Sequence, residues 1–212
     1  MAVKNEHSVY QPILDQKTDN NDGFQEPVTS IVSNTAFKQQ APSILQASWM
    51  NTILGPIITI ASDTALYLLE FVARKELALE IMRLKEKTGA EIIPGSTDLI
   101  VSIENEISAY FAGNLKSFRT PFNMLGTNFQ REVWTQLVRI PFGSRCSYLD
   151  IATAIGKPSS CRAVAGAIGC NQLALIIPCH RIIQSNGQMG GYAGGITRKK
   201  WLLQFEKAKM TQ

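Results

Sequence analysis

The sequence has few of the residues that build disulfide or metal scaffolds. It contains four cysteines and two histidines, and no two cysteines are spaced as a CxxC pair. A structural zinc site needs four Cys or His ligands at short paired spacings, and that pattern is missing. We therefore expect reduced cysteines, a cytoplasmic protein and no bound metal.

Long apolar runs are also absent from the sequence. No stretch reaches the roughly 18 residues that a membrane-spanning helix needs, and residues 53–60 are interrupted by Gly55 and Pro56. The first residues, MAVKNEHSVYQPILDQ, lack the apolar core of a secretion signal. With 45% hydrophobic and 18% charged residues, the composition predicts an ordinary globular protein with no membrane partner.

Acidic residues are scarce in the C-terminal part of the chain. Residues 121–212 hold eleven Lys and Arg but three acidic residues, whereas residues 1–120 hold ten and fourteen. The net charge of +4 therefore divides into −4 and +8. A basic region of this kind is typical of proteins that bind an anionic partner, but a solvated positive surface explains it equally well.

The pattern of apolar residues divides the chain into three parts. Residues 1–45 are polar and predict a poorly ordered extension with one short helix near residues 24–33. Residues 46–120 predict a small α/β domain, and residues 121–208 predict a mainly helical domain after a linker at 116–123. Within the α/β domain we expect a hairpin of strands at 57–61 and 65–72, an edge strand at 91–94, and helices at 75–87 and 98–111.

The C-terminal part has the spacing of a helix-turn-helix. Helices are expected at about 127–137, 148–155, 161–169 and 197–207, and Ser159 or Ser160 is expected to cap the third of these. The helix at 161–169 carries small side chains and one long cation, Arg162. Readers of the major groove carry several long polar side chains, so this smooth helix suits either a minor groove or tight protein packing.

Cys179 and His180 form the most informative pair in the sequence. They lie between two Ile-Ile pairs, which indicates buried, strand-like backbone. A thiol must become a thiolate to act as a nucleophile, and adjacent strand residues point to opposite faces. Cys–His chemistry would therefore need a kink at Pro178 or a bridging water, and Glu206 is the carboxylate best placed to orient the imidazole. A buried structural cysteine beside a satisfied core histidine is the alternative.

The run Pro178-Cys179-His180-Arg181 resembles the active-site motif of the O6-alkylguanine-DNA alkyltransferases, also called methylated-DNA–protein-cysteine methyltransferases. The resemblance covers essentially all of residues 124–208 in order and spacing, and it is looser from about 48 to 120. It implies an α/β N-terminal domain with a small RNase H-like sheet, followed by a mainly α domain with a helix-turn-helix. Its further segments are Gly126-Thr127, 129–134, 140–141, 147–148, 154–158, 162–164, Gly191-Tyr192 and 201–203.

The resemblance also implies a catalytic group around one sulfur atom. Cys179 would accept the alkyl group after His180, acting through a water molecule, takes its proton. Glu206 would orient His180. Tyr148 and Lys199 would assist the departure of guanine, with Tyr148 as the proton donor.

Further residues are assigned by the resemblance to the turn beside the site and to DNA. Asn171 would hold the turn that positions the helix-turn-helix against the active site. Arg162 would fill the space that a flipped nucleotide leaves in the base stack. The residues expected to contact DNA or the extruded base are Arg162, Ala163, Gly166, Ala167, Ser147, Arg181, Tyr192, Ala193 and Gly194.

The function implied is direct reversal of DNA damage. A monomer would flip O6-alkylguanine out of double-stranded DNA and transfer the alkyl group irreversibly to Cys179, with no cofactor and with O4-alkylthymine as an open second substrate. Ala193 departs from the family because a hydroxyl residue is common there, and the zinc-binding cysteines of the Ada regulators are absent. The alternatives are a lesion sensor that only binds, a transcriptional regulator and a cysteine hydrolase.

Overall fold

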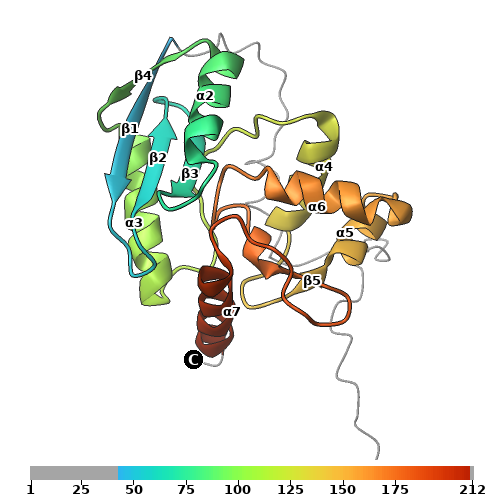
Figure 1. Ribbon diagram of the computed structural model, residues 1–212. Coiled ribbons are helices and arrows are strands. Elements are labelled where there is room, and N and C mark those ends of the chain that lie inside the picture. Colours follow the sequence, from blue (N-terminus) through green and yellow to red (C-terminus); the bar gives the residue numbers. More distant parts are fainter. Residues whose placement is uncertain (1–42, 211–212) are drawn as a thin grey trace, which may run out of the picture.

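The computed structural model of the protein describes residues 43–210. The expected extension and its short helix therefore lie outside the described residues, apart from residues 43–45. Figure 1 shows a small sheet beside a group of helices, with the C-terminal helix between and below them. No helix in the described part has the length and apolar character needed to cross a bilayer.

A four-stranded sheet in the order β3-β2-β1-β4 forms the first part of the fold. The strands are β1 (Ile44–Met50), β2 (Ile57–Ala61), β3 (Leu66–Phe71) and β4 (Glu91–Pro94). The expected hairpin of β2 and β3 is confirmed, as is the edge position of β4, which pairs in parallel with β1. The first strand, β1, begins at Ile44, two residues before the start that the sequence predicts for this domain.

Both faces of this sheet are covered, which explains why β3 is buried at every position. On one face, Leu45, Ile60 and Leu68 pack in one core with Leu84 of helix α2 (Leu77–Thr88). On the other face, β2 and β3 share a core with α3 (Asp98–Ala112) and with the C-terminal helices. This second core continues across the expected domain boundary at residue 120, so the sheet lies directly against the C-terminal part.

The segment between α3 and the next helix carries no helix or strand of its own, as the expected linker at 116–123 requires. It nevertheless contacts the sheet, because Leu66 donates a backbone hydrogen bond to Pro121 and accepts one from Asn123 at 2.9 and 2.8 Å. Helix α4 (Asn128–Val138) follows, and its N-terminus is held by a capping box formed by Thr127 and Gln130.

Two helices joined by a tight turn follow β5 (Cys146–Ser147). They are α5 (Tyr148–Ala154) and α6 (Cys161–Gly169), with the 3-10 turn η1 (Pro158–Ser160) between them. The expectation that a serine caps α6 is wrong, because no side-chain hydrogen bond caps this helix. Ser160 instead donates its hydroxyl hydrogen bond backwards to the carbonyl oxygen of Lys157, at 2.6 Å.

The backbone at Cys179 is a turn and not the expected strand. Residues Cys179–Arg181 form the 3-10 turn η2, in which the N–H of Arg181 donates to the carbonyl oxygen of Pro178 at 2.9 Å. Only β6 (Ile182–Ile183) is extended, and it pairs in parallel with β5. Helix α7 (Ile196–Met210) then ends the described chain. The apolar flanks had indicated burial correctly, but Pro178 directs the chain into the turn.

Candidate active site

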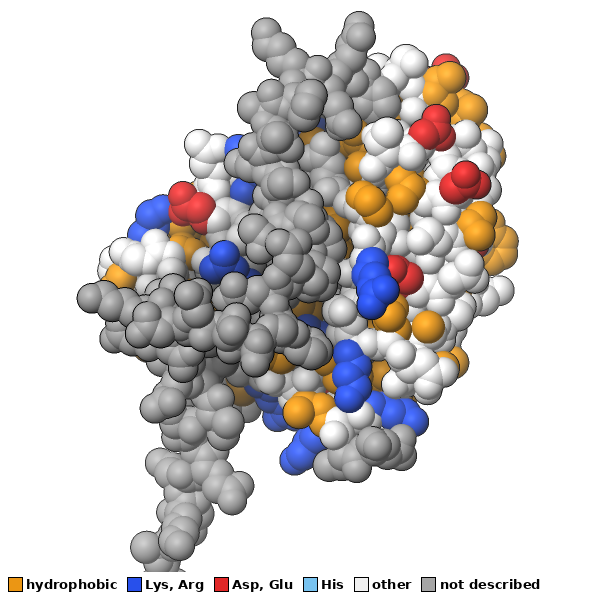
Figure 2. Space-filling view, turned by 180° about the vertical axis from the view of Figure 1, so that it is seen from behind, with side chains coloured by type: hydrophobic (Ala, Val, Ile, Leu, Met, Phe, Trp, Pro, Cys, Tyr) orange, Lys and Arg blue, Asp and Glu red, His pale blue; other side chains and the backbone are white. Residues whose placement is uncertain are grey.

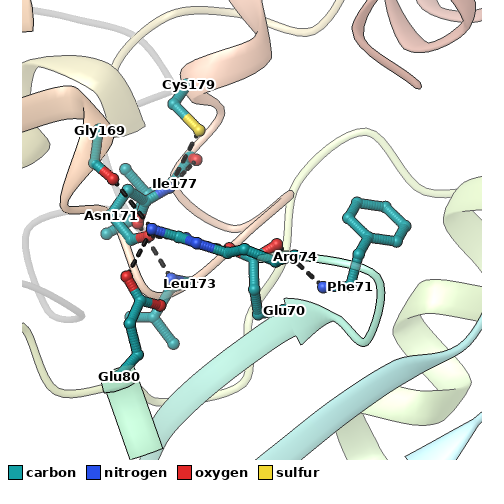
Figure 3. Close-up of polar contacts among 9 residues, drawn as sticks. All are labelled: Glu70, Phe71, Arg74, Glu80, Gly169, Asn171, Leu173, Ile177 and Cys179. Atoms are coloured by element: carbon teal, nitrogen blue, oxygen red, sulfur yellow. Dashed lines mark hydrogen bonds and ion pairs between the residues drawn. The ribbon is translucent and has the colours of Figure 1, made fainter. Parts of the chain in front are cut away.

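Cys179 lies at the start of η2 and is buried, with 8% of its surface exposed. Its Sγ accepts a hydrogen bond from Asn171 Nδ2 at 3.2 Å, which Figure 3 shows. Burial raises the pKa of the thiol to about 11, and the Asn171 hydrogen bond opposes this because it favours the thiolate. The sulfur is therefore mostly a thiol at neutral pH and needs a base to become a nucleophile.

His180 is fully buried and is held by one carboxylate. Its Nε2 lies 2.8 Å from Glu206 Oε1, and burial lowers the pKa of the imidazole. A neutral ring that donates from Nε2 keeps Nδ1 as a proton acceptor. Within the described residues, Nδ1 has no hydrogen-bond partner. His180 thus has the protonation state of a base, while its contact with Cys179 is not direct.

Glu206, on α7, is the centre of the polar network that holds His180. Its carboxylate accepts hydrogen bonds from Arg181 Nε at 3.0 Å, from Tyr110 Oη at 2.7 Å and from the N–H of Gly143 at 3.0 Å. Burial alone would raise the pKa of Glu206, but the hydrogen bonds from His180 and Arg181 outweigh burial and hold the pKa well below its usual value. The carboxylate is therefore ionised.

Arg181 is held inside the protein by the network around Glu206. It is buried, its guanidinium forms an ion pair with Glu206 at 2.9 Å, and its Nη1 donates to the carbonyl oxygen of Ile140 at 2.6 Å. All these hydrogen bonds are made within the protein, and a contact of Arg181 with DNA or the extruded base stays a prediction. Its place is in the network that keeps Glu206 charged.

Asn171 stands at the turn after α6, as expected, and holds that turn through its side chain. Its Oδ1 accepts from the N–H of Leu173 at 3.0 Å, and its Nδ2 donates to the carbonyl oxygen of Ile177 at 2.9 Å. The same Nδ2 reaches the Cys179 sulfur. Asn171 therefore fixes the loop before the nucleophile and also contacts the nucleophile itself.

Lys199 and Tyr148 meet the loop between β6 and α7. Lys199 is buried, and its Nζ donates to the carbonyl oxygens of Ile182, Gly190 and Gly191. Burial lowers the pKa of Lys199 to about 8. Tyr148 packs so closely against Gly190 that a Cβ atom there would collide with the phenol oxygen. Gly190 thus leaves room for the expected proton donor.

The other residues expected at the base-binding site include Tyr192, Ala193, Gly194 and Ser147. The ring of Tyr192 lies edge to face with His180, with their centroids 6.4 Å apart. Gly194 is buried, and a Cβ atom there would approach the Tyr192 ring to 2.7 Å. Ala193 is exposed. Ser147 caps α5 by accepting a hydrogen bond from the N–H of Asp150 at 3.1 Å, so it lies beside Tyr148.

Helix α6 carries four of the residues expected to contact DNA and exposes three of them. Arg162, Ala163 and Gly166 are exposed, and a Cβ atom added at Gly166 would meet no other atom within 4 Å. Ala167 differs, since it is 4% exposed and its carbonyl oxygen accepts a hydrogen bond from Trp134 Nε1 at 2.8 Å. Ala167 therefore faces the core, and its contact with DNA stays a prediction.

Charge is unevenly distributed over the surface. On the face seen in Figure 2, basic side chains gather toward the lower end and on the left, and most of the acidic side chains in view lie on the right, the side of the sheet. Within residues 43–210, His, Cys, Asp and Glu form no group of three or more that could hold a metal ion.

Sequence reasoning missed the contribution of the N-terminal part to this site. Tyr110, on α3, hydrogen-bonds to Glu206, and the Arg74 guanidinium donates to the carbonyl oxygen of Asn171 at 2.7 Å. The residues 98–111 were expected to form a helix with no chemical role. The sequence held only a weak signal for these contacts. It consists of Tyr110 on the apolar face of α3 and of three charged residues in or after the buried strand β3, which are Glu70, Arg74 and Glu80.

Comparison with known proteins gives concordant matches. Residues 128–208 match the family model described as the DNA-binding domain of 6-O-methylguanine DNA methyltransferase. A methylated-DNA–protein-cysteine methyltransferase of Shigella flexneri is 39% identical over 160 residues, which are 73% of this chain and 91% of that protein. The corresponding protein of Mycobacterium tuberculosis is 47% identical over 105 residues, 50% of this chain, and the match spans 64% of its length.

Solved structures agree with these sequence matches. The crystal structure of Mycobacterium tuberculosis OGT in complex with DNA is 34% identical, with a TM-score of 0.67 over 77% of this chain and 94% of that one. The archaeal O6-methylguanine-DNA methyltransferase from Pyrococcus kodakaraensis is 26% identical, with a TM-score of 0.56 over 76% and 98%. These matches agree with the geometry of the site, and they show that the chain belongs to the methylated-DNA–protein-cysteine methyltransferase family.

Proposed function

We propose that the protein repairs DNA by moving the alkyl group of O6-alkylguanine onto Cys179. The observation that carries this proposal is the grouping of a buried thiol, a neutral imidazole and an ionised carboxylate around η2. Family membership supplies the substrate class, because relatives are named for transfer from methylated DNA to a protein cysteine.

The first step is removal of the Cys179 proton. In the proposed reaction, a water molecule between Sγ and His180 Nδ1 passes this proton to the imidazole. Glu206 stabilises the resulting imidazolium through the hydrogen bond at Nε2. The thiolate is not solvated, because the sulfur is buried, and this makes it a strong nucleophile once it forms.

The second step is displacement at the alkyl carbon. The thiolate electron pair forms the S–C bond while the C–O6 bond breaks, and its electrons pass to the guanine oxygen. Tyr148 donates a proton to the departing base as negative charge develops on it. Burial raises the pKa of the Tyr148 phenol, so the phenol keeps this proton until the base departs. Lys199 holds the loop that carries Gly190 against Tyr148. The product is a thioether, which has no easy hydrolytic route back, so each molecule acts once.

Access to the sulfur requires the base to leave the helix. The sulfur is buried, and the O6-alkyl carbon is inaccessible in stacked DNA. We propose that α5, η1 and α6 act as a helix-turn-helix whose exposed small residues enter the minor groove. Arg162 then fills the stack, and Tyr192, Ala193 and Gly194 line the pocket for the flipped base. Ser147 contacts DNA beside Tyr148.

The proposal also covers the organisation of the protein. We propose an RNase H-like α/β domain at residues 46–120 and a DNA-binding, alkyl-accepting domain at 121–208, acting as a monomer in the cytoplasm without a cofactor. O4-alkylthymine remains a proposed second substrate. The alternatives of a lesion sensor, a regulator or a hydrolase are less favoured, because the acceptor thiol and its base are both in place.

The test is the repair of a duplex oligonucleotide that contains one O6-methylguanine. The expected result is restoration of guanine in an amount that equals the amount of protein added and then stops. The Cys179→Ala variant should bind the duplex and repair nothing, while Cys170→Ala, at an exposed cysteine, should repair like the wild type. Turnover beyond one equivalent, or repair by Cys179→Ala, would contradict the proposal.

A further inference from the structure

Three buried charged side chains lie next to the site but take no part in the chemistry described above. The Arg74 guanidinium lies 2.5 Å from Glu70, on β3, and 2.5 Å from Glu80, on α2. All three side chains are buried. Figure 3 shows Arg74 between the two carboxylates, with its guanidinium directed toward the turn that carries Asn171.

The same guanidinium also reaches the C-terminal part of the chain. Nη1 donates to the carbonyl oxygen of Asn171 at 2.7 Å, and Nη2 donates to the carbonyl oxygen of Gly169 at 3.0 Å. Gly169 is the last residue of α6, where carbonyl groups lack partners within the helix. Arg74 therefore holds the end of α6 and the backbone of Asn171 from the opposite side of the interface.

This arrangement suits an arginine and no other residue. A guanidinium is planar and carries its donors in a fixed fork, so it can serve two carboxylates and two carbonyl oxygens at once. The carboxylates are anchored in turn, since Glu70 Oε1 accepts from the N–H of Phe71 at 2.9 Å. The orientation of the fork is thus set by the sheet and by α2.

The turn that Arg74 holds carries the side chain that contacts the nucleophile. The backbone of Asn171 is fixed by Arg74, and the side chain of Asn171 donates to Cys179 Sγ. A shift of the backbone by a few tenths of an ångström would lengthen this 3.2 Å hydrogen bond. We infer that Arg74 is a positioning residue, which holds the Asn171 amide against the acceptor sulfur.

Electrostatics around the sulfur agree with this geometry. Arg74 lowers the pKa of the Cys179 thiol and Glu70 raises it, while burial is the largest influence. Three further groups interact electrostatically with the Cys179 thiol, namely Lys199, Tyr148 and Tyr192. The charges of Glu70 and Arg74 have opposite effects on the pKa of the Cys179 thiol. The hydrogen bond from Asn171 affects this pKa more than the Arg74 charge does, so Arg74 acts on the thiol mainly by positioning Asn171.

The inference rests on the proposed function for its purpose, but its test needs no DNA. The rate at which iodoacetamide alkylates the Cys179-containing peptide is measured against pH by mass spectrometry, which gives the pKa of this thiol. Arg74→Lys keeps the positive charge but cannot reach both carbonyl oxygens. It should raise the thiol pKa by about one unit, a tenfold loss of thiolate at neutral pH.

A double-mutant cycle with Asn171→Ala distinguishes positioning from general damage to the fold. If Arg74 acts through Asn171, then Arg74→Lys should change the thiol pKa in the wild type and leave it unchanged in the Asn171→Ala background. Arg83→Lys, on the exposed side of α2, is the matched control and should change nothing. Equal effects of Arg74→Lys in both backgrounds, or no effect in a folded protein, would overturn the inference.

The outcome remains decisive if Arg74→Lys does not fold, as judged by circular dichroism. The cycle is then run with Glu80→Gln, which leaves Arg74 in place and replaces its charged anchor by a neutral one. An additive result with Asn171→Ala would again overturn the inference. Failure of the wild type to repair O6-methylguanine would reject the proposed function alone, because the thiol profile is measured without substrate.

Discussion

At the scale of single residues, Glu206 is the carboxylate on which the other buried charges of the site depend. It accepts hydrogen bonds from His180, Arg181 and Tyr110. Glu206→Gln would leave the Arg181 guanidinium buried without its counter-charge, which typically costs about 3–5 kcal/mol. We expect this loss of unfolding free energy in urea denaturation, together with loss of alkyl transfer because His180 is no longer oriented.

The matched control for this substitution is an exposed ion pair. Glu132 and Lys157 lie 2.6 Å apart, with side chains 49% and 48% exposed. Glu132→Gln should cost no more than about 1 kcal/mol, because solvent screens such pairs. Similar losses for the two substitutions would contradict the central place given to Glu206.

The depressed pKa of Glu206 also predicts how stability depends on pH. A carboxylate whose pKa is lower in the folded state adds stability above its unfolded pKa of about 4 and loses that contribution as the pH falls through the folded value. The difference in unfolding free energy between wild type and Glu206→Gln should therefore be largest near neutral pH and should shrink in acid. Urea denaturation between pH 7 and pH 3 measures it, and a difference that grows in acid would be inconsistent with an ionised Glu206.

At the scale of elements, α6 is the helix whose exposed face we propose to enter the minor groove. Gly166 has open space where a side chain would project. Gly166→Glu should weaken binding to duplex DNA at least about tenfold, since one carboxylate facing phosphates costs over 1 kcal/mol. The fold should tolerate the change, because Gly is a poor helix residue. Fluorescence anisotropy with a labelled duplex measures the affinity.

An equivalent charge placed elsewhere provides the control. Val101 is 49% exposed on α3, away from α6 in Figure 1. Val101→Glu adds the same charge and should leave DNA affinity within about twofold. Unchanged affinity for Gly166→Glu, or an equal loss for Val101→Glu, would show that α6 is not the element that meets DNA.

The elements that could be predicted from sequence are those fixed by local signals. The hairpin of β2 and β3, the Thr127 cap and the glycine ends of α2 and α3 follow from neighbouring residues alone. Strand β1 was not among the expected strands, because Gln46 and Ser48 interrupt its apolar pattern. Burial at residues 176–183 was predictable from the apolar flanks, whereas the turn at Cys179–Arg181 takes the place of the expected strand.

The site divides in the same way. The positions of Cys179, His180 and Glu206 were expected from the motif and the family resemblance, and the structure brings all three together. Tyr110 and Arg74 were not expected, because their contacts join residues 96 and 97 positions apart. Nothing in the local sequence reports such distant partners. The ion pair of Arg181 was not expected for the same reason, since its partner, Glu206, belongs to α7.

At the scale of the whole molecule, the two parts of the chain are joined through the site. The sheet and the C-terminal helices share one apolar core, and isolated β-bridges join Leu66 to Phe122 and Leu69 to Leu173. Tyr110 reaches Glu206 on one side of the Cys–His pair, and Arg74 reaches Asn171 on the other. The N-terminal part is therefore a support for the reacting groups as well as for the fold.

The charge of the whole molecule limits how DNA binding depends on salt. Of the eleven basic residues in 121–212, Arg181 and Lys199 are buried, which leaves nine for phosphate contacts. Each contact contributes about −0.9 to the slope of log affinity against log salt, so the slope should be negative and no steeper than about −8. Anisotropy titrations from 50 to about 300 mM salt measure it. A slope near zero would remove the electrostatic basis for DNA binding.

The central claim is that one sulfur receives the alkyl group, and peptide mass spectrometry tests it most directly. After reaction with a duplex that contains O6-methylguanine, the peptide holding Cys179 should gain the mass of one methyl group. The peptides holding Cys146, Cys161 and Cys170 should gain nothing. A methyl group on any of these other cysteines, or an unmodified Cys179 in protein that has repaired its DNA, would contradict the account.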